Sequence, residues 1–163
     1  MLQITLNYWA ILVAALVSFV IGGFWYSPLF MGKPWMKLMG IEHKSKQEME
    51  AMRKKAMPAY VGSLVGSLLM AYVLAHFVEY MRLLDYEGDA NAFMGVMTGF
   101  WIWLGFIAPV MFTAVLFANK PVKLWLIDTG YQLASMLAMG AILAAWITLR
   151  LKKRYSLISL KLA

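Results

Sequence analysis

The stretch AFMGVMTGFWIWLGFIAPVMFTAVLFA, residues 92–118, contains no Asp, Glu, Lys or Arg. Three further segments share this property: 4–26, 57–78 and 129–149. Each reaches the length of about 20 residues with which a helix crosses roughly 30 Å of hydrocarbon. A helix also satisfies the hydrogen bonds of a backbone that is exposed to lipid. The sequence therefore predicts an all-α membrane protein with four transmembrane helices.

Composition agrees with this class, because 63% of the 163 residues are hydrophobic. We expect one domain, 1–149, with helices at about 4–26, 57–80, 92–118 and 124–149. A basic tail, 150–163, follows, and its last three residues resemble an expression-vector junction. The first segment lacks the basic start and the cleavage site of a signal peptide, so we expect a retained helix. The chain has no cysteine, which excludes disulfides and thiolate metal sites.

Positive charge is unevenly distributed between the three loops. Loop one contains the basic residues Lys33, Lys37, Lys44, Lys46, Arg53, Lys54 and Lys55; loop two contains Arg82 against Asp85, Glu87 and Asp89; and loop three contains Lys120 and Lys123. The positive-inside rule places loops one and three in the cytoplasm and both termini outside the plasma membrane. The tail opposes this orientation with Arg150, Lys152, Lys153, Arg154 and Lys161.

Loop one also contains a helix signal. Ser45 followed by Glu48 forms a capping box, which predicts a short helix over about 46–56. Met49, Met52 and Ala56 share one face of it, so the helix is suited to the lipid surface with its lysines toward phosphates. A solvated connector explains the same pattern, because the apolar face is small.

Two short stretches resemble each other at the ends of the first and third helices. Leu-Phe-Met-Gly-Lys-Pro at 29–34 returns as Leu-Phe-Ala-Asn-Lys-Pro at 116–121, so Lys33 and Pro34 correspond to Lys120 and Pro121. Two helical hairpins repeated in tandem would produce this echo, as in some transporters. Convergence is the alternative, since helix ends at the cytoplasmic surface favour aromatic residues, Gly or Asn, Lys and Pro.

Small residues mark two helices for close packing. Gly62 and Gly66 in the second helix, and Gly95 and Gly99 in the third, have the spacing that lets helix backbones approach one another. Pro109 lies in the middle of the third helix, where it removes one backbone hydrogen bond and predicts a kink.

Polar side chains inside a membrane are costly and so mark candidate sites. The fourth helix carries Asp128, Tyr131, Gln132 and Ser135 at i, i+3, i+4 and i+7, on one stripe. This stripe is the main candidate site, and we expect its carboxylate to face a cavity that contains water. The alternative is a structural role for Asp128, as a negative charge at the N-terminal end of a helix.

A second candidate cluster lies near the outer end of the second helix. Tyr72, His76 and Glu79 fall close to one face, where His76 and Glu79 could bind a metal or relay a proton. Two ligands are too few for a metal site, and an interfacial belt explains them equally well. We predict no metal and no cofactor. No nucleophile triad, glycine-rich phosphate loop or metal cluster supports catalysis.

Several motifs resemble one known family, the domain-of-unknown-function 1761 family of small bacterial and fungal membrane proteins. They are Asn7-Tyr8-Trp9-Ala10, Trp25-Tyr26-Ser27-Pro28-Leu29-Phe30 with Gly32-Lys33 and Trp35, the run Trp103-Leu104-Gly105-Phe106-Ile107-Ala108-Pro109, Leu116-Phe117, Gly130-Tyr131, and Met139-Gly140-Ala141-Ile142-Leu143 with Trp146. The resemblance covers about 7–146. It implies a four-helix membrane protein and supplies no activity and no catalytic residues.

Two functions fit these features best, and a membrane-embedded enzyme that uses His76 and Glu79 is a third alternative. The first is a small solute-binding or transport module that acts as a homo-oligomer, with a dimer favoured, around a cleft lined by the stripe and by Tyr60 and Thr113. The second is a non-catalytic accessory or scaffold protein that binds a partner protein and anionic lipid through its glycine faces and basic loop. Neither involves nucleic acid.

Overall fold

The computed structural model of the chain describes residues 4–84 and 91–162, without the side chains of Lys46 and 151–162. The described residues form helices and no strands. In order these are α1 (Tyr8–Trp25), α2 (Gly32–Leu38), α3 (Lys46–Lys55), α4 (Met57–Leu84), α5 (Ala92–Ile102), the π-helix η1 (Trp103–Ile107), α6 (Ala108–Phe117) and α7 (Val122–Leu162). The three acidic residues of loop two, Asp85, Glu87 and Asp89, lie outside the described residues.

Four of the helical segments are long and apolar enough to cross a membrane, which confirms the predicted fold class. They are Tyr8–Trp25, Met57–Leu84, Ala92–Phe117 and Val122–Arg150. The predicted boundaries differ most at the last helix, since α7 begins at Val122 and its backbone stays helical through the basic tail to Leu162.

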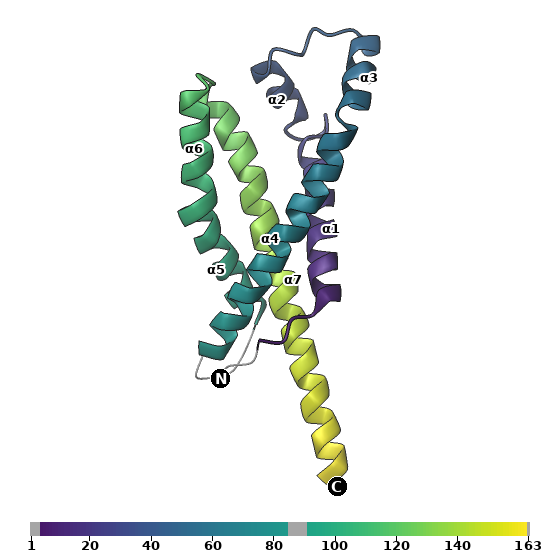
Figure 1. Ribbon diagram of the computed structural model, residues 1–163, viewed down its shortest axis with the longest axis vertical. Helices are drawn as coiled ribbons and strands as arrows, with labels where there is room; N and C mark the ends of the chain where they lie inside the picture. Colours follow the sequence, from purple (N-terminus) through teal and green to yellow (C-terminus); the bar gives the residue numbers. More distant parts are fainter. Residues whose placement is uncertain (1–3, 85–90, 163) are drawn as a thin grey trace.

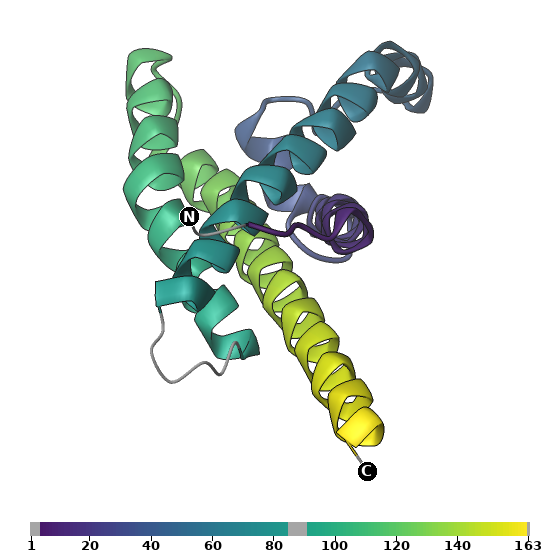
Figure 2. The same ribbon diagram turned by 60° about the horizontal axis from the view of Figure 1, so that its bottom comes forward.

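The long helix α7 organises the bundle, because α1, α4, α5 and α6 all contact it. Figure 1 shows α4 crossing α7 obliquely, and Figure 2 shows that the first half of α4 and the tip of α6 point apart. We call the end where α1 stops and α7 starts the corner end, and the opposite end the Arg150 end.

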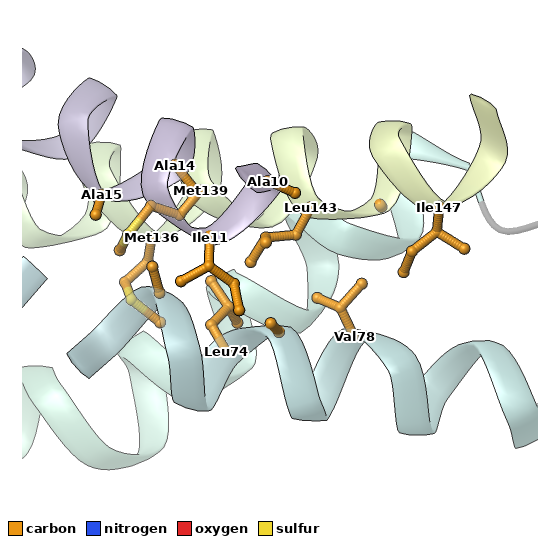
Figure 3. Packing of buried hydrophobic residues seen from close by; sticks show 13 residues of the cluster. Ala10, Ile11, Ala14, Ala15, Leu74, Val78, Met136, Met139, Leu143 and Ile147 are labelled. Atoms are coloured by element: carbon orange, nitrogen blue, oxygen red, sulfur yellow. The ribbon is translucent and has the colours of Figure 1, made fainter. Parts of the chain in front are cut away.

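The hydrophobic core lies where α1, α4 and α7 meet. Figure 3 shows Ile11, Leu74 and Met139 between these three helices. Ala10 and Ala14 are almost completely buried, so small side chains bring α1 close to its neighbours. Close approach of this kind supplies van der Waals contact, which replaces the hydrophobic effect as the packing force inside lipid.

Glycines join α5 to α7 with almost no space between the two backbones. A Cβ atom added to Gly95 would collide with the carbonyl oxygen of Gly140, and one added to Gly99 would collide with that of Met136. Nothing in the chain lies within 4 Å of a Cβ atom added at Gly62 or Gly66, so close packing of this pair stays a prediction. The first half of α4, which carries both glycines, points away from α6 and α7 (Figure 2).

Pro109 acts on the third transmembrane segment through the residues before it. The segment is α-helical to Ile102, then forms the five-residue π-helix η1, and resumes as α6 with Pro109 in its first turn. A proline has no backbone N–H to donate, and a wider π turn is one way for a helix to adjust to this.

The short helix of loop one begins with the predicted capping box. The Ser45 amide donates to Glu48 Oε2 at 2.8 Å, and the Glu48 amide donates to Ser45 Oγ at 3.3 Å. These hydrogen bonds lower the pKa of the Glu48 carboxyl below its usual value. The pKa of Glu48 is lower in the folded protein than in the unfolded chain, where it is about 4.3. The cap therefore stabilises α3 fully above that ordinary pKa, and this stabilisation is lost as the pH falls through the pKa of the folded state.

The two Lys-Pro corners lie at the same end of the bundle but have different backbones. Lys33 and Pro34 are inside the short helix α2, whereas Lys120 and Pro121 precede α7. Asn119 has a φ of 55°, in the left-handed region, and turns the chain from α6 toward α7. An internal repeat therefore stays a prediction.

Candidate functional site

The polar stripe of α7 packs mainly against α1. A Cβ atom added to Gly22 would lie 3.1 Å from the hydroxyl oxygen of Tyr131, so this glycine makes room for the ring. Ser135 is completely buried and Asp128 is half-buried. The helix that faces Asp128 and Tyr131 is α1.

The centre of the site is a hydrogen bond between two distant parts of the chain. The Tyr26 hydroxyl donates to Asp128 Oδ1 at 2.8 Å. The side chain of Trp35 and the positive charge of Lys120 also interact with this carboxylate. A carboxylate inside a transmembrane helix therefore has partners from the end of α1, from α2 and from the loop before α7.

Aromatic rings surround Tyr26. Its ring centroid lies 5.6 Å from that of Trp35 and 5.6 Å from that of Tyr131, with edge-to-face geometry in both pairs. We call the four side chains Tyr26, Trp35, Asp128 and Tyr131 the corner site.

Burial and the neighbouring Asp128 raise the pKa of the Tyr26 hydroxyl above its ordinary value of about 10. The hydroxyl therefore stays protonated and donates at neutral pH. Because the pKa is higher in the folded protein, the hydrogen bond stabilises the fold fully below the ordinary pKa of tyrosine. It is lost as the pH rises through the pKa of the folded state.

Several buried polar atoms on α1 and α7 have no hydrogen-bond partner among the described residues. They include Gln132 Oε1, Ser135 Oγ and Ser18 Oγ. Since Tyr26 meets Asp128 and Gly22 meets Tyr131, the antiparallel register places Ser18 opposite Ser135. Unpaired buried oxygen atoms are costly, so the seam between α1 and α7 has unused capacity for a hydrogen-bond donor or a cation.

Two tryptophans hold the start of α7 in position for the site. Trp25 Nε1 donates to the carbonyl oxygen of Ile127 at 3.0 Å, and Trp103 Nε1 donates to that of Thr129 at 2.9 Å. These carbonyls flank Asp128 in the chain, so the carboxylate is fixed from α1 on one side and from η1 on the other.

The three residues of the predicted second cluster differ in burial. Tyr72 and His76 pack edge to face on an accessible part of α4 at a centroid distance of 4.7 Å, whereas Glu79 is buried with 1% of its surface exposed. The obliquely crossing α4 exposes a different face at each level, so residues with similar helical phase differ in burial. The described residues contain no group of three His, Asp or Glu side chains arranged for a metal ion.

Other expected lining residues are elsewhere. The Thr113 hydroxyl donates to carbonyl oxygens of its own helix, and Tyr60 is 48% exposed on the diverging half of α4. The cavity at the Arg150 end and the hollow beside Lys33 and Lys37 are not lined by Asp128. The expectation of an aqueous cavity at Asp128 therefore stays a prediction.

Sequence reasoning missed Tyr26 and Trp35 as site residues. Both belong to the aromatic stretch at the end of the first helix, which an interfacial belt already explains. A signal for Tyr26 would have been the presence of an unpaired carboxylate at the same membrane level, near the start of the fourth helix.

The fold and the site define a small all-helical protein with four membrane-type helices and a carboxylate held at one end of the bundle. Within this class, a family model described as "Protein of unknown function (DUF1761)" matches residues 9–144. The chain belongs to this family, as its motifs indicate. Searches against curated proteins and against solved structures found no match.

Proposed function

We propose that the protein is a small solute-binding or transport module that recognises a cationic solute at the corner site. The observation that carries the proposal is the half-buried Asp128 carboxylate, bonded to Tyr26 and bordered by the rings of Trp35 and Tyr131. A carboxylate beside aromatic faces favours a cation, through charge pairing and through the ring quadrupoles.

The seam between α1 and α7 offers the solute further contacts beyond Asp128. The unpaired oxygen atoms of Gln132, Ser135 and Ser18 follow Asp128 toward the middle of the membrane. Ordered oxygen atoms of this kind replace water around a cation as it enters a helix bundle. The corner site is closed by the Tyr26 hydroxyl, so entry requires this side chain to leave Asp128.

Binding of a cation is testable with the purified protein in detergent. Tetraphenylphosphonium and choline serve as probes, and tryptophan fluorescence reports binding because Trp35 is part of the site. We expect saturable binding of at least one probe and a loss of at least about tenfold in affinity for Asp128→Asn, since an interaction with a charged group is typically worth 1.5–3 kcal/mol.

The matched control is Glu50→Gln, which removes an exposed carboxylate on α3 and leaves the site intact. Tyr26→Phe is expected to keep or increase affinity, because the tyrosine hydroxyl competes with the cation for Asp128. Equal affinity of Asp128→Asn and the unmodified protein, with both folded, would refute the cation site.

We also infer that the chain works as a homo-oligomer, with a dimer favoured, and that the corner end faces the cytoplasm. Four helices leave little room for a passage inside one chain, and a second copy would complete one. The expected result is a dimer mass in native mass spectrometry across a range of detergent concentrations. A monomer under all mild conditions would contradict it.

A second candidate function is an accessory protein that binds anionic lipid at the corner end. A hollow there is lined by Lys33, Pro34, Met36, Lys37 and Glu42, and α3 packs on α4 with most of its side chains exposed. Isolated helices of this length are marginal in water, so a lipid surface would supply a partner for α3. Copurification of a stoichiometric protein partner from native membranes would favour this function over transport.

A further inference from the structure

A carboxylate at the opposite end of the bundle is buried in an unusual environment. Glu79 on α4 has 1% of its surface exposed and, with Asp128, is one of two acidic residues in the membrane-type segments. An ionised carboxylate at such a position needs several hydrogen bonds or charge partners to offset its lost hydration.

Two arginines supply charge to only one of its oxygen atoms. Glu79 Oε1 lies 2.8 Å from Arg82 Nη2 and 3.6 Å from Arg150 Nη2. Glu79 Oε2 is buried and has no hydrogen-bond partner. One half of the carboxylate is therefore unsatisfied, although its ion pairs are in place.

A small cavity lies beside this residue. It has a volume of about 20 Å³ and is bordered by all three core helices. Its lining residues are Thr5, Leu6, Asn7, Ala10, Ala75, Glu79, Leu143, Trp146, Ile147 and Arg150. A cavity needs about 10–15 Å³ to hold one water molecule, so this one accommodates a single water and excludes a larger solute.

Arg150 is a lining residue of the cavity that also reaches the surface. Its side chain is 34% exposed, it lines the cavity, and its Nη1 donates to the carbonyl oxygen of Thr5 at 2.9 Å. Arg150 thus connects α7 to the segment before α1 and, through Glu79, to α4. Its contact with Glu79, at 3.6 Å, is the longer of the two ion pairs and the easier to open.

We propose that this cavity is a binding site for one water molecule, held by Glu79 Oε2 and bordered by the Arg150 side chain. The water donates a hydrogen to Oε2 and so satisfies the half of the carboxylate that the arginines leave free. The proposal does not depend on the cation site at the other end of the bundle.

The absence of native cysteine allows a clean accessibility test in detergent. Ala75→Cys places a thiol on the cavity wall, and Ala71→Cys places one on the same helix away from the cavity. A charged methanethiosulfonate reagent is larger than the cavity, so both thiols are expected to react slowly while Arg150 is present.

Removing the ion pair between Arg150 and Glu79 should change the reaction rate of one thiol only. In the Arg150→Gln and Glu79→Gln backgrounds we expect Ala75→Cys to react at least about tenfold faster, because the local opening that exposes it becomes easier. The Ala71→Cys rate should stay unchanged, and Arg150→Lys should lie close to the unmodified background. Equal rates for Ala75→Cys in all folded backgrounds would overturn the role of Arg150.

The bound water itself has a separate readout. A structure at high resolution is expected to show density within hydrogen-bonding distance of Glu79 Oε2, at about 2.7 Å. A dry cavity in such a structure would overturn the water site. This outcome says nothing about cation binding at Asp128, so failure of either proposal is distinguishable from failure of the other.

Discussion

Glu79→Ala is expected to destabilise the protein by about 3–5 kcal/mol, the usual cost of removing one partner of a buried ion pair. The substitution leaves the guanidinium groups of Arg82 and Arg150 without their carboxylate in a mostly buried position. It also removes the atom that connects α4 to α7 at the Arg150 end. Unfolding in mixed detergent micelles, followed by tryptophan fluorescence, measures the difference in free energy.

The control for this prediction is Glu50→Ala, which removes an exposed carboxylate and should change stability by less than about 1 kcal/mol. Replacing the whole cluster with apolar residues, as in Glu79→Leu with Arg82→Met and Arg150→Met, should recover most of the loss, because no charge is then left unpaired. A cost for Glu79→Ala no larger than that of Glu50→Ala would show that the ion pairs are not formed.

Gly95→Ala is expected to cost about 1–3 kcal/mol, although it adds one methyl group. The added Cβ atom meets the carbonyl oxygen of Gly140, which belongs to a helix backbone and has no rotamer with which to move away. The two helices must therefore separate, and contacts along the whole of α5 weaken. The same unfolding titration measures this loss, and Gly140→Ala should show a similar one.

Gly66→Ala is the matched control. It makes the same chemical change in a helical glycine, but nothing lies within 4 Å of the added Cβ atom. We expect unchanged or slightly higher stability, since alanine is favoured over glycine in a helix by up to about 1 kcal/mol. If Gly95→Ala were as harmless as Gly66→Ala, the close contact between α5 and α7 would be wrong.

The contrast between these glycines shows how far the sequence predicts this fold. Segments without charge predict the four helices, because hydrocarbon excludes charge wherever a helix crosses it. The spacing of Gly62 and Gly66 matches that of Gly95 and Gly99, yet only the second pair has a neighbouring helix. Spacing shows which backbone is able to approach another, and the crossing angle decides whether it does.

The sequence predicts one part of the corner site and misses the other. The periodicity of Asp128, Tyr131 and Ser135 predicts a polar stripe, since residues one helical turn apart share a face. Its partner Tyr26 is about a hundred positions away in the chain, and the pairing depends on the register between α1 and α7. The sequence predicts Arg150 only as part of a basic tail, because its contact with Glu79 depends on how α4 crosses α7.

The π-helix before Pro109 rotates one half of its transmembrane segment relative to the other. Up to Trp103, the packed face runs through Gly95, Thr98, Gly99 and Ile102, which predicts Phe106 and Val110 as the next inward positions. Those two are 71% and 65% exposed, while Ile107 and Ala108 turn inward instead.

The wide turn thus advances the inward face by one residue, about 100° of rotation. With this rotation Ala108 lies next to Trp125 of α7, whose Nε1 donates to the Ala108 carbonyl oxygen at 3.0 Å. One extra residue in a helix is therefore enough to let a single membrane crossing present two differently oriented faces to α7. Deleting a residue from 103–107 should let the segment continue as a regular α-helix with Ile107 and Ala108 still facing inward, because it removes the residue that the wide turn accommodates.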